Sequence, residues 1–203
     1  MTPSNTGIDD CLIVPVSANR DARGCLFELY RQTWPGTFPA LQWNACASDA
    51  GVLRGAHVHV DYDEYYTLLR GRVVLGLCDI RRSSPTFGKS AQFEWVTEDA
   101  IAVVVPVGVA HVVLFEEDSV LAFGLSSYWK AEYDLVGCQF DDPALGFAWP
   151  SRPVTRSQRD REAGNYQEML ESFAERSAAW RVERALNGAP PAVQRVSIQD
   201  TSA

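Results

Sequence analysis

The chain has 203 residues and a formal net charge of −8 at pH 7, with 46% hydrophobic and 22% charged residues. These values are typical of one folded domain and exclude a disordered chain. The negative charge argues against nucleic acid or an anionic membrane as a partner, because both are negatively charged themselves. Five scattered cysteines without a C-x-x-C pair and no signal-peptide pattern indicate a cytoplasmic protein with reduced thiols.

Residues 1–10 are polar, and we expect them to be loose. From residue 11 to about residue 125 the chain consists of short apolar, β-branched runs separated by Gly, Pro, Asn and Asp. Short strands in close succession predict an antiparallel sandwich or barrel, not a sheet of β-α-β units. The predicted strands are 11–16, 25–30, 67–70, 73–78, 101–105, 112–115 and 120–125.

The composition changes after Trp149-Pro150 and predicts a helix further on. Asn165 occupies an N-cap position, with Glu168 three residues later, and Gly188 provides a stop. We therefore expect an all-β barrel over 11–160, a C-terminal helical extension over 161–188 and a disordered tail over 189–203. The helical spacing is formed by Tyr166, Met169, Leu170, Phe173, Ser177 and Trp180.

Three histidines are present, and their spacing is informative. His57 and His59 form an H-x-H pair, whose side chains share one face if the pair lies on a strand. Glu64 follows five residues later, and His111 comes just after the turn sequence Pro106-Val107-Gly108.

This layout resembles the two signatures of the cupin superfamily. The first is Gly, five residues, H-x-H, a short spacer, Glu, six residues and Gly, here from Gly51 to Gly71; the second is Pro-x-Gly-x-x-His. The Asn that closes the second signature is replaced by Phe115. The resemblance implies a jelly-roll β-barrel (double-stranded β-helix). It also implies one divalent transition metal (Fe, Mn, Ni, Co or Zn), with His57, His59, Glu64 and His111 as its ligands.

A second resemblance covers about three quarters of the chain, from residue 21 to residue 160. The sequence is similar to the dTDP-4-dehydrorhamnose 3,5-epimerase family, which implies a homodimer that binds a nucleotide-activated 4-keto-6-deoxy sugar such as a dTDP-sugar. The matching stretches are Asp21-Ala22-Arg23-Gly24, Val52-Leu53-Arg54-Gly55-Ala56-His57, Ile80-Arg81-Arg82-Ser83-Ser84-Pro85-Thr86-Phe87-Gly88, Pro106-Val107-Gly108-Val109-Ala110-His111, Asp142-Pro143, Trp149-Pro150 and Ser157-Gln158-Arg159-Asp160.

The family resemblance also implies roles for single residues. His57 matches the catalytic base of the family, and Asp160 matches the carboxylate paired with that base. The places of the nucleotide-binding and sugar-binding residues are held by Arg23, Glu28, Gln42, Asn44 and Arg54, and Tyr128 holds a place where it can stack on the base of the nucleotide.

Other parts of the family machinery are missing. Glu64 replaces the conserved Lys, His59 replaces the Gln after the base, Leu75 replaces an acidic residue, and Phe123 replaces the catalytic Tyr. The substitutions at positions 59 and 64 remove epimerase residues and supply two metal ligands. A metal-bound His57 cannot also act as a base, so ordinary 3,5-epimerisation is not expected, and the candidate proton carriers are Asp160, Tyr65, Tyr66 or a metal-bound water.

Three hypotheses follow. The first is a metal-dependent isomerase, epimerase or lyase that acts beside the carbonyl of a nucleotide-activated 4-keto sugar or a similar small molecule. The second is an Fe(II)-dependent oxygenase acting on a small molecule in a biosynthetic pathway. The third is a cupin that binds a ligand without catalysis.

Overall fold

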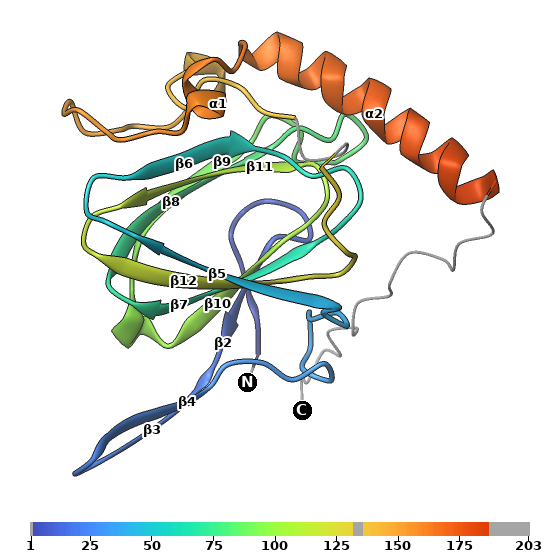
Figure 1. Cartoon of the computed structure of the whole chain (residues 1–203). Helices are drawn as coiled ribbons and strands as arrows, with labels where there is room; N and C mark the ends of the chain where they lie inside the picture. Colours follow the sequence, from blue (N-terminus) through green and yellow to red (C-terminus); the bar gives the residue numbers. More distant parts are fainter. Residues whose placement is uncertain (1, 132–135, 187–203) are drawn as a thin grey trace.

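The structure, a computed structural model, describes residues 2–131 and 136–186. Over these ranges two sheets face each other, a hairpin projects from them, and a helical segment covers one side (Figure 1). The strands are β1 (Ser4–Asn5), β2 (Leu12–Pro15), β3 (Ser17–Asp21), β4 (Gly24–Glu28), β5 (Gln42–Ser48), β6 (Leu53–His57), β7 (Glu64–Arg70), β8 (Arg72–Asp79), β9 (Ser90–Val96), β10 (Ile101–Val105), β11 (Val109–Phe115) and β12 (Ser119–Leu125). The helices are α1 (Gln158–Arg161) and α2 (Tyr166–Leu186), with 3-10 turns at Thr97–Asp99 and Pro143–Leu145.

The two large sheets form a jelly roll. One sheet has the order β1-β2-β10-β7-β12-β5, and the other has the order β6-β11-β8-β9. From β5 to β12 the chain crosses from one sheet to the other at every connection except the one between β8 and β9. This alternation is characteristic of the jelly roll. The predicted cupin-type barrel is therefore confirmed.

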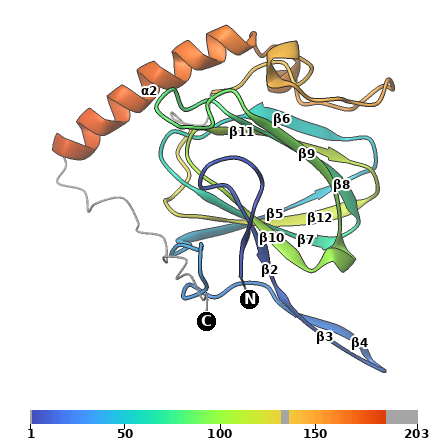
Figure 2. The ribbon, with the colours of Figure 1, turned by 180° about the vertical axis from the view of Figure 1, so that it is seen from behind.

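Apolar side chains fill the space between the sheets. Leu75, Trp95, Val103 and Phe115 are almost completely buried there. The outer face of the four-stranded sheet is covered by the segment 136–154 and by the start of α2, whose Met169 and Leu170 pack in the cluster that contains Ala110 and Val112 (Figure 2). Burial of each of these larger side chains contributes about 1.5–3 kcal/mol.

Each of the seven predicted strands overlaps an observed strand, and 101–105 coincides with β10. The strands that sequence reasoning missed are β1, β3, β5, β6 and β9. β5 shows the reason, because inward polar side chains such as Gln42 and Asn44 alternate with the exposed Trp43. A strand of this kind has no apolar run to reveal it.

The helix prediction is confirmed at its start. Asn165 Oδ1 accepts the Glu168 N–H at 3.0 Å, and Glu168 Oε2 accepts the Asn165 N–H at 2.8 Å. This reciprocal pair is a capping box, which satisfies N–H groups that otherwise have no partner at a helix start. The tail predicted over 189–203 lies outside the described residues. The N-terminal segment, which we expected to be loose, pairs β1 with β2 and buries Ile8.

The segment before α1 runs back along the barrel. Leu53 N–H donates to Thr155 O at 2.9 Å, and Thr155 N–H donates to Gly51 O at 2.9 Å. These bonds hold the segment beside the start of β6 and bring α1 and Asp160 close to that strand. None of the helices in the described ranges is long and apolar enough to span a membrane.

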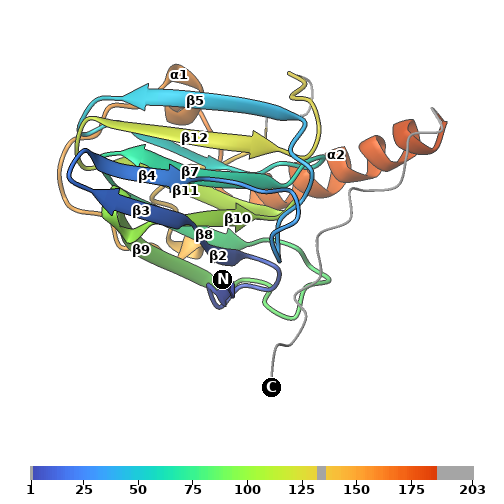
Figure 3. The same cartoon turned by 90° about the horizontal axis from the view of Figure 1, so that it is seen from below.

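The β3–β4 hairpin extends beyond the barrel (Figures 1 and 2), and in the view from below it lies in front of the barrel strands (Figure 3). Its turn carries Arg23, whose side chain is 90% exposed and pairs with Asp21 at 2.6 Å. Glu28, at the end of β4, pairs with Arg31. Two residues of the predicted substrate-binding set, Arg23 and Glu28, therefore lie on an element that projects from the barrel.

Candidate active site

A pocket of about 410 Å³ opens into the barrel between β5 and β6, the outermost strands on this side of the two sheets. A volume of this order is normal for a small-molecule site. The polar and charged side chains of its wall are Gln42, Asn44, Arg54, His57, His59, Tyr62, Glu64, Tyr66, His111 and Arg159.

His57 and Asp160 form a pair at the rim. His57 Nε2 lies 2.6 Å from Asp160 Oδ1, and only 5% of the carboxylate side chain is exposed. Burial by itself raises the pKa of Asp160, but the hydrogen bond from His57 and the one from Ser157 outweigh it, so the pKa falls below its ordinary value. The carboxylate is therefore ionised at neutral pH and fixes the orientation of the imidazole.

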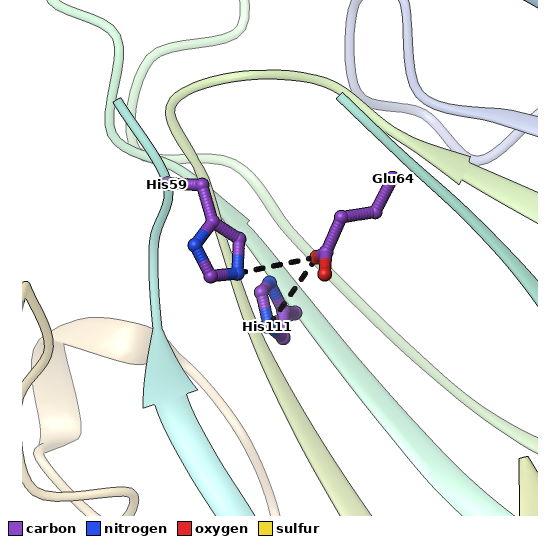
Figure 4. Close-up of side chains that lie close together, drawn as sticks. All are labelled: His59, Glu64 and His111. Atoms are coloured by element: carbon purple, nitrogen blue, oxygen red, sulfur yellow. Dashed lines mark ion pairs between the residues drawn. The ribbon is translucent and has the colours of Figure 1, made fainter. Parts of the chain in front are cut away.

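The other two histidines converge on Glu64. His59 Nε2 lies 3.4 Å and His111 Nε2 lies 3.6 Å from Glu64 Oε2. Glu64 begins β7, His111 lies within β11 and His59 follows the end of β6, and the three side chains point toward one another (Figure 4). One ligand atom of each lies within 4.8 Å of the others, and all three residues are buried. Tyr66 donates its hydroxyl to the same Glu64 oxygen at 2.7 Å.

Burial keeps both of these histidines neutral. It lowers the pKa of His59 well below the ordinary value, and the neighbouring histidines lower it further. Burial and the proximity of His57 lower the pKa of His111 to about 3. Neutral imidazole is the form that binds a metal. Two imidazole nitrogens and one carboxylate oxygen thus form a donor set that suits a divalent transition metal.

The end of β6 explains why His57 and His59 separate. The strand stops at His57, so the period-two rule that predicts a shared direction does not continue to His59. His59 instead lies beyond the strand, where its carbonyl accepts the N–H of Gly108 at 3.2 Å. Gly108 has φ +79, a conformation that favours glycine, and its turn leads directly into β11 and His111. The structure therefore groups three of the four predicted ligands and places His57 with Asp160.

The predicted substrate-binding residues also divide into two groups. Gln42, Asn44 and Arg54 line the pocket, and Gln42 Nε2 donates to Asn44 Oδ1 at 3.1 Å. Arg23 and Glu28 lie on the projecting hairpin instead and are not among the residues that line the pocket.

Two predicted aromatic residues lie outside the pocket wall. Tyr128 is 64% exposed, while its neighbour Trp129 lines the pocket and donates its backbone N–H to Gln42 Oε1 at 3.0 Å. Tyr65, predicted as a proton carrier, points out of the barrel interior, and its hydroxyl donates to Leu29 O at 2.7 Å. The alternation along β7 places Tyr66 on the pocket side and Tyr65 on the other.

Sequence reasoning did not identify several residues of the wall. Arg159 lies next to Asp160, and Tyr62 stacks on His59 with ring centroids 4.3 Å apart. The remainder is apolar. A wall residue on a strand could be found from sequence only once the register of the strands is known. These apolar residues are Cys46, Val113, Phe115, Leu121 and Leu125; Phe123 also lines the pocket, and the sequence resemblance already places it where the family has its catalytic Tyr.

The fold and the pocket define a jelly-roll protein with a small-molecule site that opens between two strand edges. The family described as dTDP-4-dehydrorhamnose 3,5-epimerase matches residues 5–168, and the chain belongs to this family. A curated dTDP-4-dehydrorhamnose 3,5-epimerase from Salmonella typhimurium is 31% identical over 157 residues, which are 71% of this chain and 84% of that protein.

Solved structures agree with the family. An epimerase from Mycobacterium tuberculosis has a TM-score of 0.78 at 25% identity and covers 90% of this chain and 99% of its own. A dTDP-6-deoxy-D-glucose-3,5-epimerase from Legionella pneumophila, solved with dTDP-4-keto-L-rhamnose, has a TM-score of 0.77 at 27% identity, covering 84% and 95% of the two chains. The resemblance inferred from the sequence motifs is therefore confirmed for the family and the barrel.

Proposed function

We propose that the protein moves a proton beside the carbonyl of a dTDP-linked 4-keto sugar and thereby isomerises the sugar. The observation that carries this proposal is the pairing of His57 with Asp160, although the His57 ring lies only 6.1 Å from the His111 ring, centroid to centroid. His57 is paired with Asp160 at 2.6 Å, whereas His59 and His111 lie around Glu64 in the same pocket. A base and an electrophilic site can therefore act together, which a His57 bound to metal would not allow.

The His57–Asp160 pair is suited to general base catalysis. The buried carboxylate orients the imidazole and stabilises the imidazolium that forms when His57 accepts a proton. His57 lines the pocket, so a substrate carbon bound there is within its reach. The family of the chain supports a dTDP-sugar as the substrate.

The opposite wall favours isomerisation over epimerisation. Inversion at a carbon needs an acid on the face opposite the base, and Phe123 stands where the family resemblance implies a Tyr. Tyr66 pairs with Phe123 in register on the adjacent strand, but its hydroxyl already donates to Glu64. One base on one face instead suits transfer of a proton between adjacent carbons.

The proposed step is balanced without an oxidant. His57 removes the proton from the hydroxyl-bearing carbon beside the carbonyl, and that C–H electron pair forms the double bond of an enediolate. The imidazolium returns the proton to the former carbonyl carbon, while the hydroxyl proton passes to the neighbouring oxygen. The carbonyl thus moves by one carbon, and the enzyme returns to its starting state.

His59, Glu64 and His111 are the residues that would hold a divalent metal in this pocket. With bonds of about 2.1 Å, two ligand atoms of a tetrahedral site lie about 3.4 Å apart. The separations of 3.4 and 3.6 Å from Glu64 Oε2 fit this geometry before any ion is bound. A bound Fe, Mn, Ni, Co or Zn ion supplies Lewis acidity that polarises the carbonyl and stabilises negative charge on its oxygen.

The test is turnover of a dTDP-4-keto-6-deoxy sugar in D₂O, followed by NMR. We expect a product with a relocated carbonyl, and less than one deuterium per turnover if His57 returns part of the same proton. Inversion at the two carbons flanking the carbonyl would instead assign the chain to ordinary 3,5-epimerisation. Absence of any change in the sugar, with dTDP still bound, would favour the non-catalytic binding module.

A second function, Fe(II)-dependent oxygenation, is favoured by one observation. Two histidines and one carboxylate are the ligand set of non-haem Fe(II) oxygenases, and the triad contains these residue types. Consumption of dioxygen by the iron-loaded protein, and not by the zinc-loaded protein, would support this alternative and exclude the isomerase.

The active unit in this proposal is a homodimer. The β3–β4 hairpin projects from the barrel, and its Leu26 is 72% exposed, so an apolar side chain is available there for contact with a second copy of the chain. Arg23 and Glu28, expected to bind the substrate, lie on the same hairpin. If the hairpin of one protomer reaches the pocket of another, the exposed leucine is covered and Arg23 gains an anionic ligand.

A further inference from the structure

The pocket changes from polar to apolar along the barrel axis. The antiparallel register places three residues side by side at each level, one each on β7, β12 and β5. Glu64 marks the polar level, with the histidines facing it, and two further levels follow at intervals of two residues. These levels are Glu64–Leu125–Gln42, Tyr66–Phe123–Asn44 and Leu68–Leu121–Cys46.

The third level has apolar neighbours on the facing sheet. β11 contributes His111, Val113 and Phe115 to the pocket at successive inward positions, so its contribution also becomes apolar. Val113, Phe115 and Leu121 are all buried. We call the part of the pocket formed by Cys46, Val113, Phe115, Leu121 and Phe123 the apolar end.

Among the described residues, the side chains of the apolar end offer a ligand no hydrogen-bond partner stronger than the Cys46 thiol. Tyr66 and Asn44 border it at the level of Phe123; the Tyr66 hydroxyl donates to Glu64, and Asn44 Oδ1 accepts a hydrogen bond from Gln42 Nε2. Arg54 is exposed and pairs in register with Val113, so it borders the apolar end on the solvent side, where its Nε–H donates to Ser48 Oγ at 3.1 Å. The cation thus lies on the exposed rim beside the apolar end, where it suits a diphosphate.

The difference between the polar level at Glu64 and the apolar end limits where a ligand can carry hydroxyl groups. A hydroxyl that is buried without a partner weakens binding by about 5- to 150-fold, whereas a methyl or methylene group in the same place gains from leaving water. An ordinary sugar carries a hydroxyl on nearly every ring carbon. A sugar with hydroxyls on all sides would leave one or more of them unpaired against Leu121 and Phe115.

We infer that the substrate has two chemically different ends. One end, with the carbonyl and its adjacent hydroxyl, faces His57 and the His59–Glu64–His111 triad. The other end carries methyl or methylene carbons without hydroxyls and lies against the apolar end. This inference rests on the proposed function for the choice of the reacting end, and it specifies a multiply deoxygenated sugar or a comparably hydroxyl-poor α-hydroxy ketone as the substrate class.

Two six-carbon acids test the inference without a nucleotide or a reaction. 2-Hydroxyhexanoate and gluconate share the carboxylate and adjacent hydroxyl, but only gluconate has hydroxyls along its tail. Calorimetry with the full chain as purified is expected to give at least fivefold tighter binding of 2-hydroxyhexanoate. Equal affinities, tighter binding of gluconate, or no binding of either acid would overturn the inference.

A matched pair of variants locates the effect. Leu121→Thr and Leu121→Val introduce side chains of similar size and shape, but only Thr can accept and donate a hydrogen bond. The preference for 2-hydroxyhexanoate should fall at least threefold in L121T relative to L121V, and equal preferences in the two variants would overturn the assignment. This comparison measures binding of two acids and requires no turnover of a dTDP-sugar. It can therefore be interpreted even if the proposed isomerisation is not found.

Discussion

His57 Nε2 lies 2.6 Å from Asp160 Oδ1, although the two residues are 103 positions apart in the chain. One comes from the end of a barrel strand and the other from a short helix that follows the barrel. The pair distinguishes this pocket from a site in which all three histidines are metal ligands. Its chemical role and its independence from the triad can be tested separately.

Replacement of the carboxylate should lower turnover and leave metal binding intact. Asp160→Asn keeps the size of the side chain but cannot stabilise an imidazolium, so we expect a loss of about 10²- to 10⁴-fold. The measurement is the single-turnover rate of deuterium exchange into the sugar, with metal content determined by mass spectrometry. Asp141→Asn, at an exposed site outside the pocket, is the control, and an unchanged rate in D160N would contradict a role for the pair.

The triad predicts a specific loss of metal. Glu64 carries the negative charge of the triad, because His59 and His111 are neutral. Glu64→Gln removes this charge, so we expect at least a tenfold loss of affinity for one equivalent of Zn, Mn or Fe. Elemental analysis and competition with a chromophoric chelator measure it, and Glu98→Gln, a change on the surface, is the control. Undiminished binding in E64Q, or no bound metal in the wild type after exposure to each ion, would contradict the site.

The homodimer can be tested by mixing two inactive variants. Arg23→Ala and His57→Asn are each expected to inactivate the homodimer, by losing a substrate contact or the base. If Arg23 acts across the interface, a mixed dimer has one intact pocket and one doubly altered pocket, so an equal mixture should recover roughly a quarter of wild-type activity. No recovery after unfolding and refolding of the mixture would show that Arg23 does not act in trans.

Asp79 should make stability depend on acid pH. Burial by itself raises the pKa of this carboxyl, but hydrogen bonds from Arg81, Ser84 and Thr86 outweigh it and lower the pKa to about 2. Because the folded-state pKa is below the unfolded value of 3.8, the stabilisation is complete above pH 4 and disappears as the pH falls toward 2.

The matching variant is Asp79→Asn. At pH 7 it should lower the free energy of unfolding by on the order of 2 kcal/mol, and Asp99→Asn at a surface turn is the control. Urea unfolding at several pH values measures the difference between wild type and D79N. That difference should narrow between pH 4 and pH 2, and a difference that is constant with pH would exclude Asp79 as the cause.

The sequence was most informative where one physical signal was strong. The apolar β-branched run at Ile101–Val105 and the cap formed by Asn165 and Glu168 identify a strand and a helix start without tertiary information. β5 and β9 carry weak signals, because each has polar residues on a face that solvent or the pocket occupies. Their existence depends on their neighbours in the sheet.

The candidate site shows the same limit. His59, Glu64 and His111 follow from spacing, because a turn and a strand register bring them together. The direction of His57 does not, since it depends on where β6 ends and on a carboxylate about a hundred residues away. Nor does the choice between Tyr65 and Tyr66, which the register of β7 against β12 decides.

The backbone bonds between Leu53 and Thr155 and between Thr155 and Gly51 have a consequence for the order of events during synthesis. All strands of the barrel precede residue 126, so they leave the ribosome before the segment that carries Asp160. A nascent barrel can therefore form while His57, the proposed base, still lacks Asp160. In the proposed mechanism the enzyme becomes active only in a separate, later step, when the returning segment docks along β6.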